Sequence, residues 1–276
     1  MKFSISREAL IKPLNLVAGV VERRQTLPIL SNVLLSLEGT QLSLTGTDLE
    51  VELIGRGEVE AGAIDGEITV PARKLVDICK SLPDSSQIEF SVDSGKATVK
   101  AGRGRFTLST LPATEFPSVD ESAGDQTLEI AQSVVKRLID RTAFAMAQQD
   151  VRYYLNGMLL ELKAGRLRMV ATDGHRLAPC TAKEAVSTGD AAIIIPRKGV
   201  LELSRLLDTD ESIRLVIGSN HIRAANRQFT FTSKLVDGKF PEYSYPTEAE
   251  LKLKTGAQVM FVKNDPEAEK RFYNGK

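Results

Sequence analysis

The chain has 276 residues and carries 36 Lys and Arg against 36 Asp and Glu, so its formal net charge is zero. With 42% hydrophobic and 26% charged residues, its composition is that of a globular protein, which excludes a mostly disordered, collagen-like or coiled-coil chain. Its apolar runs, such as 33–37 and 191–195, are far shorter than the roughly 20 residues that span a bilayer. The charged N-terminus and the two cysteines indicate neither a secretory signal nor a disulfide framework, so we expect a cytoplasmic protein with no membrane partner.

The first half of the chain begins with an expected helix. Ser6 is a suitable cap for an amphipathic helix that runs to about Val21, in which Pro13 should cause a kink or a shortened start. A second helix should begin at Pro71 and end near Leu82, because proline is tolerated at the first helical position. The strands of this half are expected at 32–38, 41–45, 50–54, 87–92, 97–101 and 105–109.

The same order returns at an offset of 125 residues. Residues 30–37 align without a gap with 155–162, and Thr47-Asp48 falls on Thr172-Asp173. A repeat of this size indicates a duplicated domain rather than a solenoid, and the helices of the second copy are expected over 132–149 and 196–207. Each copy is therefore an α+β unit, an antiparallel sheet layer with two helices. We expect domain 1 over 1–118, a linker over 119–126, domain 2 over 127–245, and a tail over 246–276 that is compatible with a β-hairpin.

Charge is sorted between helices and strands although the whole chain is neutral. Each of the four expected helices carries a net charge of +2; the one over 71–82, for example, has Arg73, Lys74 and Lys80 against Asp77. The helices together hold +8, which leaves −8 on the strands, loops and tail. Ordinary solvated helix faces would explain any one of these charges. Four of them on one surface would attract a polyanion such as duplex DNA without reading its bases.

The sequence offers little for catalysis. It has no phosphate-binding loop, and His175 next to Asp173 is more readily explained by a turn than by a general base. A nuclease that uses Asp48 and Asp173 fails for lack of clustered carboxylates, and the two cysteines lack the company of further metal ligands. We therefore expect no enzyme, no cofactor and no metal site.

Several segments resemble the bacterial DNA sliding clamp, the β subunit of DNA polymerase III. They are 26–30 (TLPIL), 42–48 (LSLTGTD), 70–74 (VPARK), 150–157 (DVRYYLNG), 171–177 (ATDGHRL), 195–200 (IPRKGV) and 231–238 (FTSKLVDG). The resemblance runs from Met1 to about Tyr243. It implies a duplicated DNA-clamp domain and a processivity factor: in that family two chains of three domains close into a ring around double-stranded DNA and tether the polymerase.

The resemblance also implies three sets of site residues. DNA contacts fall on Arg24, Arg73, Gln149, Tyr153, Arg197 and Lys198. A cleft for linear peptides of the DNA polymerase and the clamp loader falls on Leu155, Thr172, Gly174, His175, Arg176, Leu177 and Pro241. The subunit interface falls on Lys74, Ile78, Leu82, Phe106 and Leu108.

Past Tyr243 we expect the resemblance to stop, with no third family domain and a tail that is similar to a short stretch of a PIF1-like DNA helicase core. Since the family ring joins domain 1 to domain 3 of another chain, closure of the ring and the state of association stay open between a monomer and a ring of three chains. Two functions follow as hypotheses. One is a processivity factor; the other is a peptide-binding adaptor or decoy that does not encircle DNA.

Overall fold

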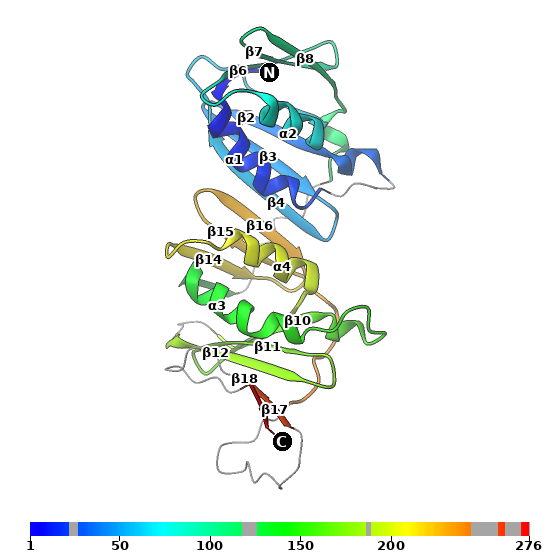
Figure 1. Cartoon of the computed structure of the whole chain (residues 1–276), viewed down its shortest axis with the longest axis vertical. Helices are drawn as coiled ribbons and strands as arrows, with labels where there is room; N and C mark the ends of the chain where they lie inside the picture. The colour runs from blue at the N-terminus through cyan, green and yellow to red at the C-terminus, as the bar shows by residue number, and fades with distance from the viewer. Residues whose placement is uncertain (22–26, 118–125, 186–188, 244–258, 263–271, 276) are drawn as a thin grey trace. The chain divides into compact units, whose positions relative to one another are not determined.

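The computed structural model describes residues 1–21, 27–117, 126–185, 189–243, 259–262 and 272–275. These fall into two compact units. Unit 1 comprises Met1–Ala123 and Arg223–Ser233, and unit 2 comprises Gly124–Ile222 and Lys234–Lys276. Each unit combines antiparallel strands with two α-helices (Figure 1), which confirms the α+β class.

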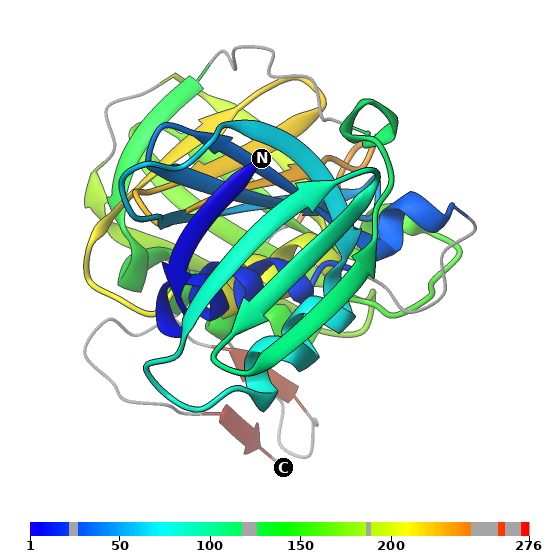
Figure 2. The same ribbon diagram turned by 90° about the horizontal axis from the view of Figure 1, so that it is seen from above.

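Unit 1 places helices α1 (Arg7–Ala18) and α2 (Ala72–Ser81) against antiparallel strands, with short 3-10 helices η1 (Pro28–Ser31) and η2 (Ala113–Glu115) between elements. One sheet has the order β1-β6-β7-β8, and β1 lies beside β6 in Figure 2; the other set has the order β5-β2-β3-β4-β16. The strands are β1 (Lys2–Ser6), β2 (Asn32–Glu38), β3 (Gln41–Thr47), β4 (Val51–Glu58), β5 (Gly66–Pro71), β6 (Gln87–Asp93), β7 (Lys96–Ala101), β8 (Gly104–Ser109) and β16 (Phe229–Lys234).

Unit 2 repeats the plan with α3 (Gln132–Thr142), α4 (Arg197–Leu206), η3 (Ala143–Ala145) and η4 (Tyr153–Leu155). Its main sheet has the order β12-β11-β10-β13, and β14 pairs with β9. The strands are β9 (Gln126–Ala131), β10 (Gly157–Lys163), β11 (Arg166–Thr172), β12 (Leu177–Ala185), β13 (Ala191–Pro196), β14 (Ser212–Ile217), β17 (Val259–Val262) and β18 (Phe272–Gly275), while β15 (His221–Ala225) crosses the boundary between the units. In the tail, β17 pairs antiparallel with β18.

The duplication is confirmed element by element. At the offset of 125 residues, β2 coincides with β10, β3 with β11, β5 with β13 and α2 with α4, without a shift at either end. The core of each copy follows the expected stripes: Leu10, Leu14 and Val17 of α1 are fully buried, as are Val135 and Leu138 of α3. No helix in the described ranges is long and apolar enough to cross a bilayer.

The expected C-terminal ends of two helices are wrong. Helix α1 begins at Arg7, capped by the Ser6 hydroxyl that accepts a hydrogen bond from the Ala9 amide at 3.2 Å, so of the two effects expected of Pro13, a kink or a shortened start, the shortened start does not occur. The helix ends at Ala18 rather than near Val21, and α3 ends at Thr142, where the shorter η3 takes over, rather than continuing to residue 149. Apolar periodicity continued past both ends because residues after each helix, such as Val20 and Met146, are also buried without being α-helical.

Pro13 lies in the helix interior, where it faces glycines on strand β4. It is buried, and a Cβ atom built on Gly55 would lie 2.8 Å from its carbonyl oxygen. Proline has no N–H for the carbonyl four residues earlier, that of Ala9, and a Cβ on Gly57 would lie 3.1 Å from that oxygen. Because glycine has no side chain, Gly55 and Gly57 allow a proline-containing helix to lie close against the sheet.

Candidate DNA and peptide interfaces

The residues expected to contact DNA occupy equivalent places in the two copies. Arg73 is the second residue of α2 and Lys198 the second residue of α4, so each lies in a first helical turn. Arg73 is exposed and Lys198 partly exposed. The Arg197 guanidinium donates to the Met146 carbonyl at 3.5 Å, which ties the start of α4 to the segment before the loop 147–156. Arg24 lies outside the described residues.

The helix charges are close to those expected. Helices α2, α3 and α4 each keep a net charge of +2, but α1 as folded holds Arg7 and Lys12 against Glu8, a net charge of +1. Arg7 also has a structural task, because its side chain donates to the Cys79 carbonyl at 2.8 Å and to Asp84 at 2.7 Å. Within unit 1, α2 therefore presents more cationic charge than α1.

The loop 147–156 displays the expected contacts Gln149 and Tyr153. Its ends are joined by the Ala147 amide, which donates to the Leu155 carbonyl at 3.0 Å. Tyr153 is 57% exposed, and Gln149 has a φ of 56°, a conformation that residues other than glycine rarely adopt. An exposed side chain on a strained backbone, in a loop whose ends are hydrogen-bonded to each other, is typical of a functional position.

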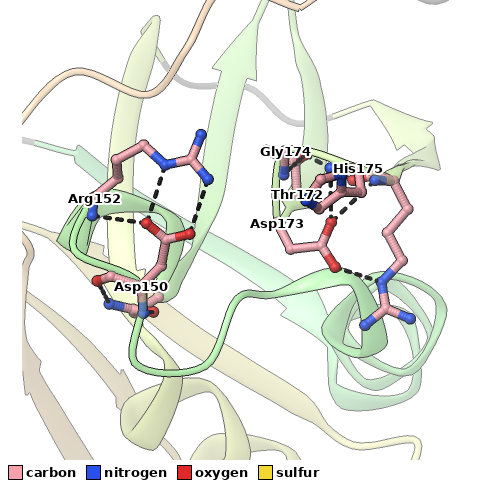
Figure 3. Close-up of polar contacts among 8 residues, drawn as sticks. Asp150, Arg152, Thr172, Asp173, Gly174 and His175 are labelled. Carbon is pink, nitrogen blue, oxygen red and sulfur yellow. Dashed lines mark hydrogen bonds and ion pairs between the residues drawn. The ribbon is translucent and has the colours of Figure 1, made fainter.

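Asp150 is the organising residue of this loop. The Asn156 side chain accepts from its amide and donates to its carbonyl, both at 2.9 Å, and its carboxylate receives two hydrogen bonds from the Arg152 side chain (Figure 3). The hydrogen bonds from the Arg152 side chain and amide lower the pKa of Asp150 to about 2. The carboxylate therefore stabilises the loop fully above its ordinary pKa of 3.8, and that contribution is lost as the pH falls toward 2.

The turn 172–177 is held by its own polar side chains. The Asp173 carboxylate accepts from the amides of His175 and Arg176, each at 3.0 Å, and from the Arg176 guanidinium at 2.9 Å (Figure 3). The Thr172 hydroxyl donates to the Arg176 carbonyl at 2.7 Å. Both oxygens of Asp173 thus serve the turn, which supports the structural explanation of this pair over a His175–Asp173 general base.

Unit 1 contains the same turn without the same surroundings. The Asp48 carboxylate accepts from the amides of Glu50 and Val51 at 2.9 and 2.7 Å, and Leu49 adopts a φ of 77° where the second copy has Gly174 with 89°. In unit 2 the loop 147–156 lies close to the turn 172–177 at this glycine: a Cβ atom added to Gly174 would lie 3.1 Å from the Arg152 guanidinium. The turn is thus a shared scaffold, and the residues around it differ between the copies.

An apolar patch lies on one face of the main sheet of unit 2. Buried Leu159, Val170, Ile194 and Phe240 form its floor. Four partly exposed side chains surround the floor, and we call them the unit 2 patch: Tyr154, Leu177, Val236 and Tyr243. Of the residues expected to bind peptides, Leu177 belongs to this patch; Gly174, His175, Arg176 and Pro241 are exposed, Thr172 is partly exposed, and Leu155 is 1% exposed.

Of the four side chains of the unit 2 patch, sequence reasoning found only Leu177. Tyr154, Val236, Phe240 and Tyr243 were not among the expected peptide contacts, although the Tyr153-Tyr154 doublet and the aromatic residues after β16 were visible signals. Unit 1 offers a comparison within the same chain. There the equivalent cluster is Ile29, Leu30 and Phe116 with Leu34 and Leu111, and the position of Leu177 is taken by Glu52.

The residues expected at a subunit interface lie in unit 1, where β8 is an edge strand of its sheet. Phe106 and Leu82 are partly exposed and Lys74 is exposed, whereas Ile78 and Leu108 are 9% and 3% exposed. The last two can therefore act mainly by supporting the edge.

In the described part of the chain, no three His, Cys, Asp or Glu residues gather as a metal site. Cys79 and Cys180 are buried, and burial raises the pKa of the Cys79 thiol to about 11, which leaves it protonated and unreactive at neutral pH.

A duplicated α+β domain with cationic helices and a partly exposed apolar patch defines a protein of the DNA-clamp class. The comparisons with known proteins agree. Residues 1–120 match the DNA polymerase III beta subunit, N-terminal domain, and residues 129–242 match its central domain. The chain belongs to the bacterial beta sliding clamp family, which consists of polymerase processivity factors and not of enzymes.

The relatives are close in sequence and structure. The beta sliding clamp of Pseudomonas aeruginosa is 66% identical over 245 residues, which is 88% of this chain and 67% of that protein. The clamp of Escherichia coli is 48% identical over 263 residues, 94% of this chain and 72% of that protein. The crystal structure of the Pseudomonas aeruginosa DNA polymerase III subunit beta has a TM-score of 0.86 at 65% identity, covering 88% of this chain and 67% of that one.

These comparisons bear on the expected limits of the resemblance. The chain spans about two thirds of the length of its relatives. The match to the central-domain model ends at residue 242 and the similarity to the Pseudomonas aeruginosa clamp covers 245 residues, in line with a resemblance that runs to about Tyr243, while similarity to the Escherichia coli clamp covers 263 residues. They lend no support to a helicase resemblance of the tail 246–276, most of which lies outside the described residues.

Proposed function

We propose that this chain is a DNA polymerase processivity factor that binds duplex DNA without sequence preference and docks linear peptides of the polymerase and the clamp loader on unit 2. The observation that carries the proposal is a contrast between the copies. The turn is the same in both and each has an apolar cluster, but the partly exposed side chains of the unit 2 cluster include Tyr154, Leu177 and Tyr243, whereas unit 1 has Glu52 at the position of Leu177. An extended peptide with one or two large apolar side chains suits such a surface. The cytoplasmic location expected from the sequence agrees with this role.

DNA would be held by the first turns of α2 and α4 and by the loop 147–156. Arg73, Lys198 and Gln149 lie there, and nothing in the described part of either unit resembles a recognition helix or an aromatic stacking ladder. Cations in these positions contact phosphates and carry no sequence information. Binding should therefore be insensitive to sequence and sensitive to salt.

Replacing Arg73 and Lys198 together with alanine is expected to reduce the slope of log affinity against log salt by about 2, if each cation neutralises one phosphate. Fluorescence anisotropy with two duplexes of unrelated sequence measures the slope, and both duplexes should give the same result. The control is Lys96→Ala with Lys100→Ala, which removes the same charge from exposed positions on β7. An unchanged slope in the Arg73 and Lys198 variant would place the DNA elsewhere.

A second candidate function is the adaptor or decoy that binds peptides without encircling DNA. It requires the unit 2 patch alone and none of the helix cations. Retention on circular but not on linearised DNA separates the two candidates. The edge strand β8, with Phe106 and Leu82 beside it, is the surface through which we expect any self-association.

A further inference from the structure

A row of polar side chains crosses the main sheet of unit 2 on the face that carries the unit 2 patch. Glu161 on β10 lies directly opposite Arg168 on β11, and Arg168 lies opposite Thr181 on β12. Leu159 and Val170 stand two residues away on the same strands, also opposite each other. Because side chains alternate along a strand, the polar row and the apolar floor of the unit 2 patch share one face.

Tyr243 joins the polar row from outside the sheet. Its hydroxyl donates to the Glu161 carboxylate at 3.2 Å and lies 3.5 Å from the Arg168 guanidinium. Arg168 in turn lies 3.6 Å from the Glu161 carboxylate and donates to the Thr181 hydroxyl at 3.1 Å. The side chains of Arg168 and Glu161 are 30% and 21% exposed, so this network is partly shielded from water.

The segment from Val236 to Tyr243 is fastened over the sheet at both ends. The Val236 amide donates to the Ile194 carbonyl of β13 at 2.9 Å. At the other end, the Tyr243 ring packs edge-on against Phe240 with centroids 6.3 Å apart, while its hydroxyl reaches the polar row. Pro241, an expected peptide contact, lies between these two aromatic residues in the chain.

The equivalent positions in unit 1 are built differently. Glu161 and Arg168 correspond to Ser36 and Ser43 at the offset of 125 residues. The Ser36 hydroxyl donates to Glu67 on the neighbouring strand at 2.9 Å. A Glu–Arg pair therefore occurs at this place only in the copy that carries the unit 2 patch.

We infer that Glu161, Arg168 and Tyr243 form a latch that holds the segment 236–243 on the sheet and so positions Phe240 and Pro241 for the bound peptide. This inference rests on the proposed peptide docking. All three are positioning residues. Tyr243 also contributes its ring to the unit 2 patch, whereas Glu161 and Arg168 act only by holding the Tyr243 hydroxyl. Releasing the latch leaves the floor of the patch intact but frees the wall that should close against the ligand.

The test is the variant Tyr243→Phe, which keeps the ring and removes the hydroxyl. We expect its affinity for a fluorescent peptide ending in Leu-Phe to fall by roughly two- to tenfold, the factor that corresponds to one net hydrogen bond, through a faster dissociation rate. Hydrogen exchange at the Val236 amide should accelerate, while DNA binding stays as in the unmodified chain. Glu161→Gln keeps an acceptor for the Tyr243 hydroxyl and should retain part of the affinity. Ser36→Ala, which changes the unit 1 position equivalent to Glu161, should alter neither peptide affinity nor exchange at Val236.

The outcomes separate the latch from the proposed function. Unchanged peptide affinity and unchanged exchange in Tyr243→Phe overturn the latch. If the unmodified chain fails to bind the peptide, the proposed docking is wrong, and faster exchange at Val236 in the variant would still support the latch as a fastening of this segment. A loss of affinity with unchanged exchange would also overturn it, since the hydroxyl would then act on the peptide directly.

Discussion

Replacing Leu177 with alanine is expected to weaken binding of a peptide ending in Leu-Phe by about 1 to 3 kcal/mol, or roughly 5- to 150-fold, the range for a buried apolar anchor. Leu177 is the first residue of β12 and lies on the same sheet face as the floor of the unit 2 patch. It is partly exposed, so it has apolar area left to bury against a ligand. Isothermal titration calorimetry measures the change directly.

The matched control is Leu111→Ala. Leu111 is also a partly buried leucine beside an apolar cluster, but that cluster is the unit 1 counterpart, where Glu52 occupies the position of Leu177. Its replacement should leave peptide affinity as it is. Equal losses in both variants would mean that the peptide does not select unit 2, and an unchanged affinity in Leu177→Ala would refute the assigned docking surface.

The variant Gly55→Ala is expected to destabilise unit 1 by about 1 to 3 kcal/mol, the range for inserting atoms into a well-packed core. The added Cβ would lie 2.8 Å from the Pro13 carbonyl oxygen and 2.9 Å from its Cβ atom. Neither atom is the end of a flexible side chain, so α1 would have to move away from β4. The midpoint of urea denaturation, followed by circular dichroism, reports the loss.

Gly104→Ala provides the comparison for this strand glycine. Its added Cβ would lie 3.2 Å from the ring of Phe106, which is partly exposed and can rotate aside, and 3.3 Å from the Ala101 carbonyl oxygen, farther than the 2.8 Å to the nearest backbone atom at Gly55. The cost should therefore be clearly smaller than for Gly55. If both variants lose the same stability, the close approach of α1 to the sheet is not what requires glycine at position 55.

The sequence predicted well those helices and strands whose ends are marked by turn residues or proline. Alternation and turn residues placed β2 at 32–38 without error, and proline marked the starts of α2 and α4 to within one residue. Helix α1 was predicted too long because Val20 and Val21 are buried without being helical. The internal repeat gave the duplication directly, since a register of 125 residues is a property of the sequence alone.

The candidate site was harder to predict from the sequence, because its contacts join residues far apart in the chain. The resemblance supplied the turn 172–177 and the loop around Gln149, but no spacing rule connects Tyr243 with Glu161, which lie 82 positions apart. The hairpin turns show the same limit: the amides of Gly39 and Ala164 donate to Asp65 and Asp190, each 26 residues away. Such contacts follow from sheet register, which only the folded chain displays.

Processivity of the polymerase tests the central proposal most directly. The measurement is the length of DNA synthesised in one binding event by the replicative polymerase of the same organism on a primed circular template, with clamp loader and ATP, with and without this chain. We expect longer products in its presence, and a reduced effect both with Leu177→Ala and with Arg73→Ala and Lys198→Ala together. Unchanged or shorter products, from a chain that still binds the polymerase peptide, would contradict the processivity factor and favour the adaptor or decoy.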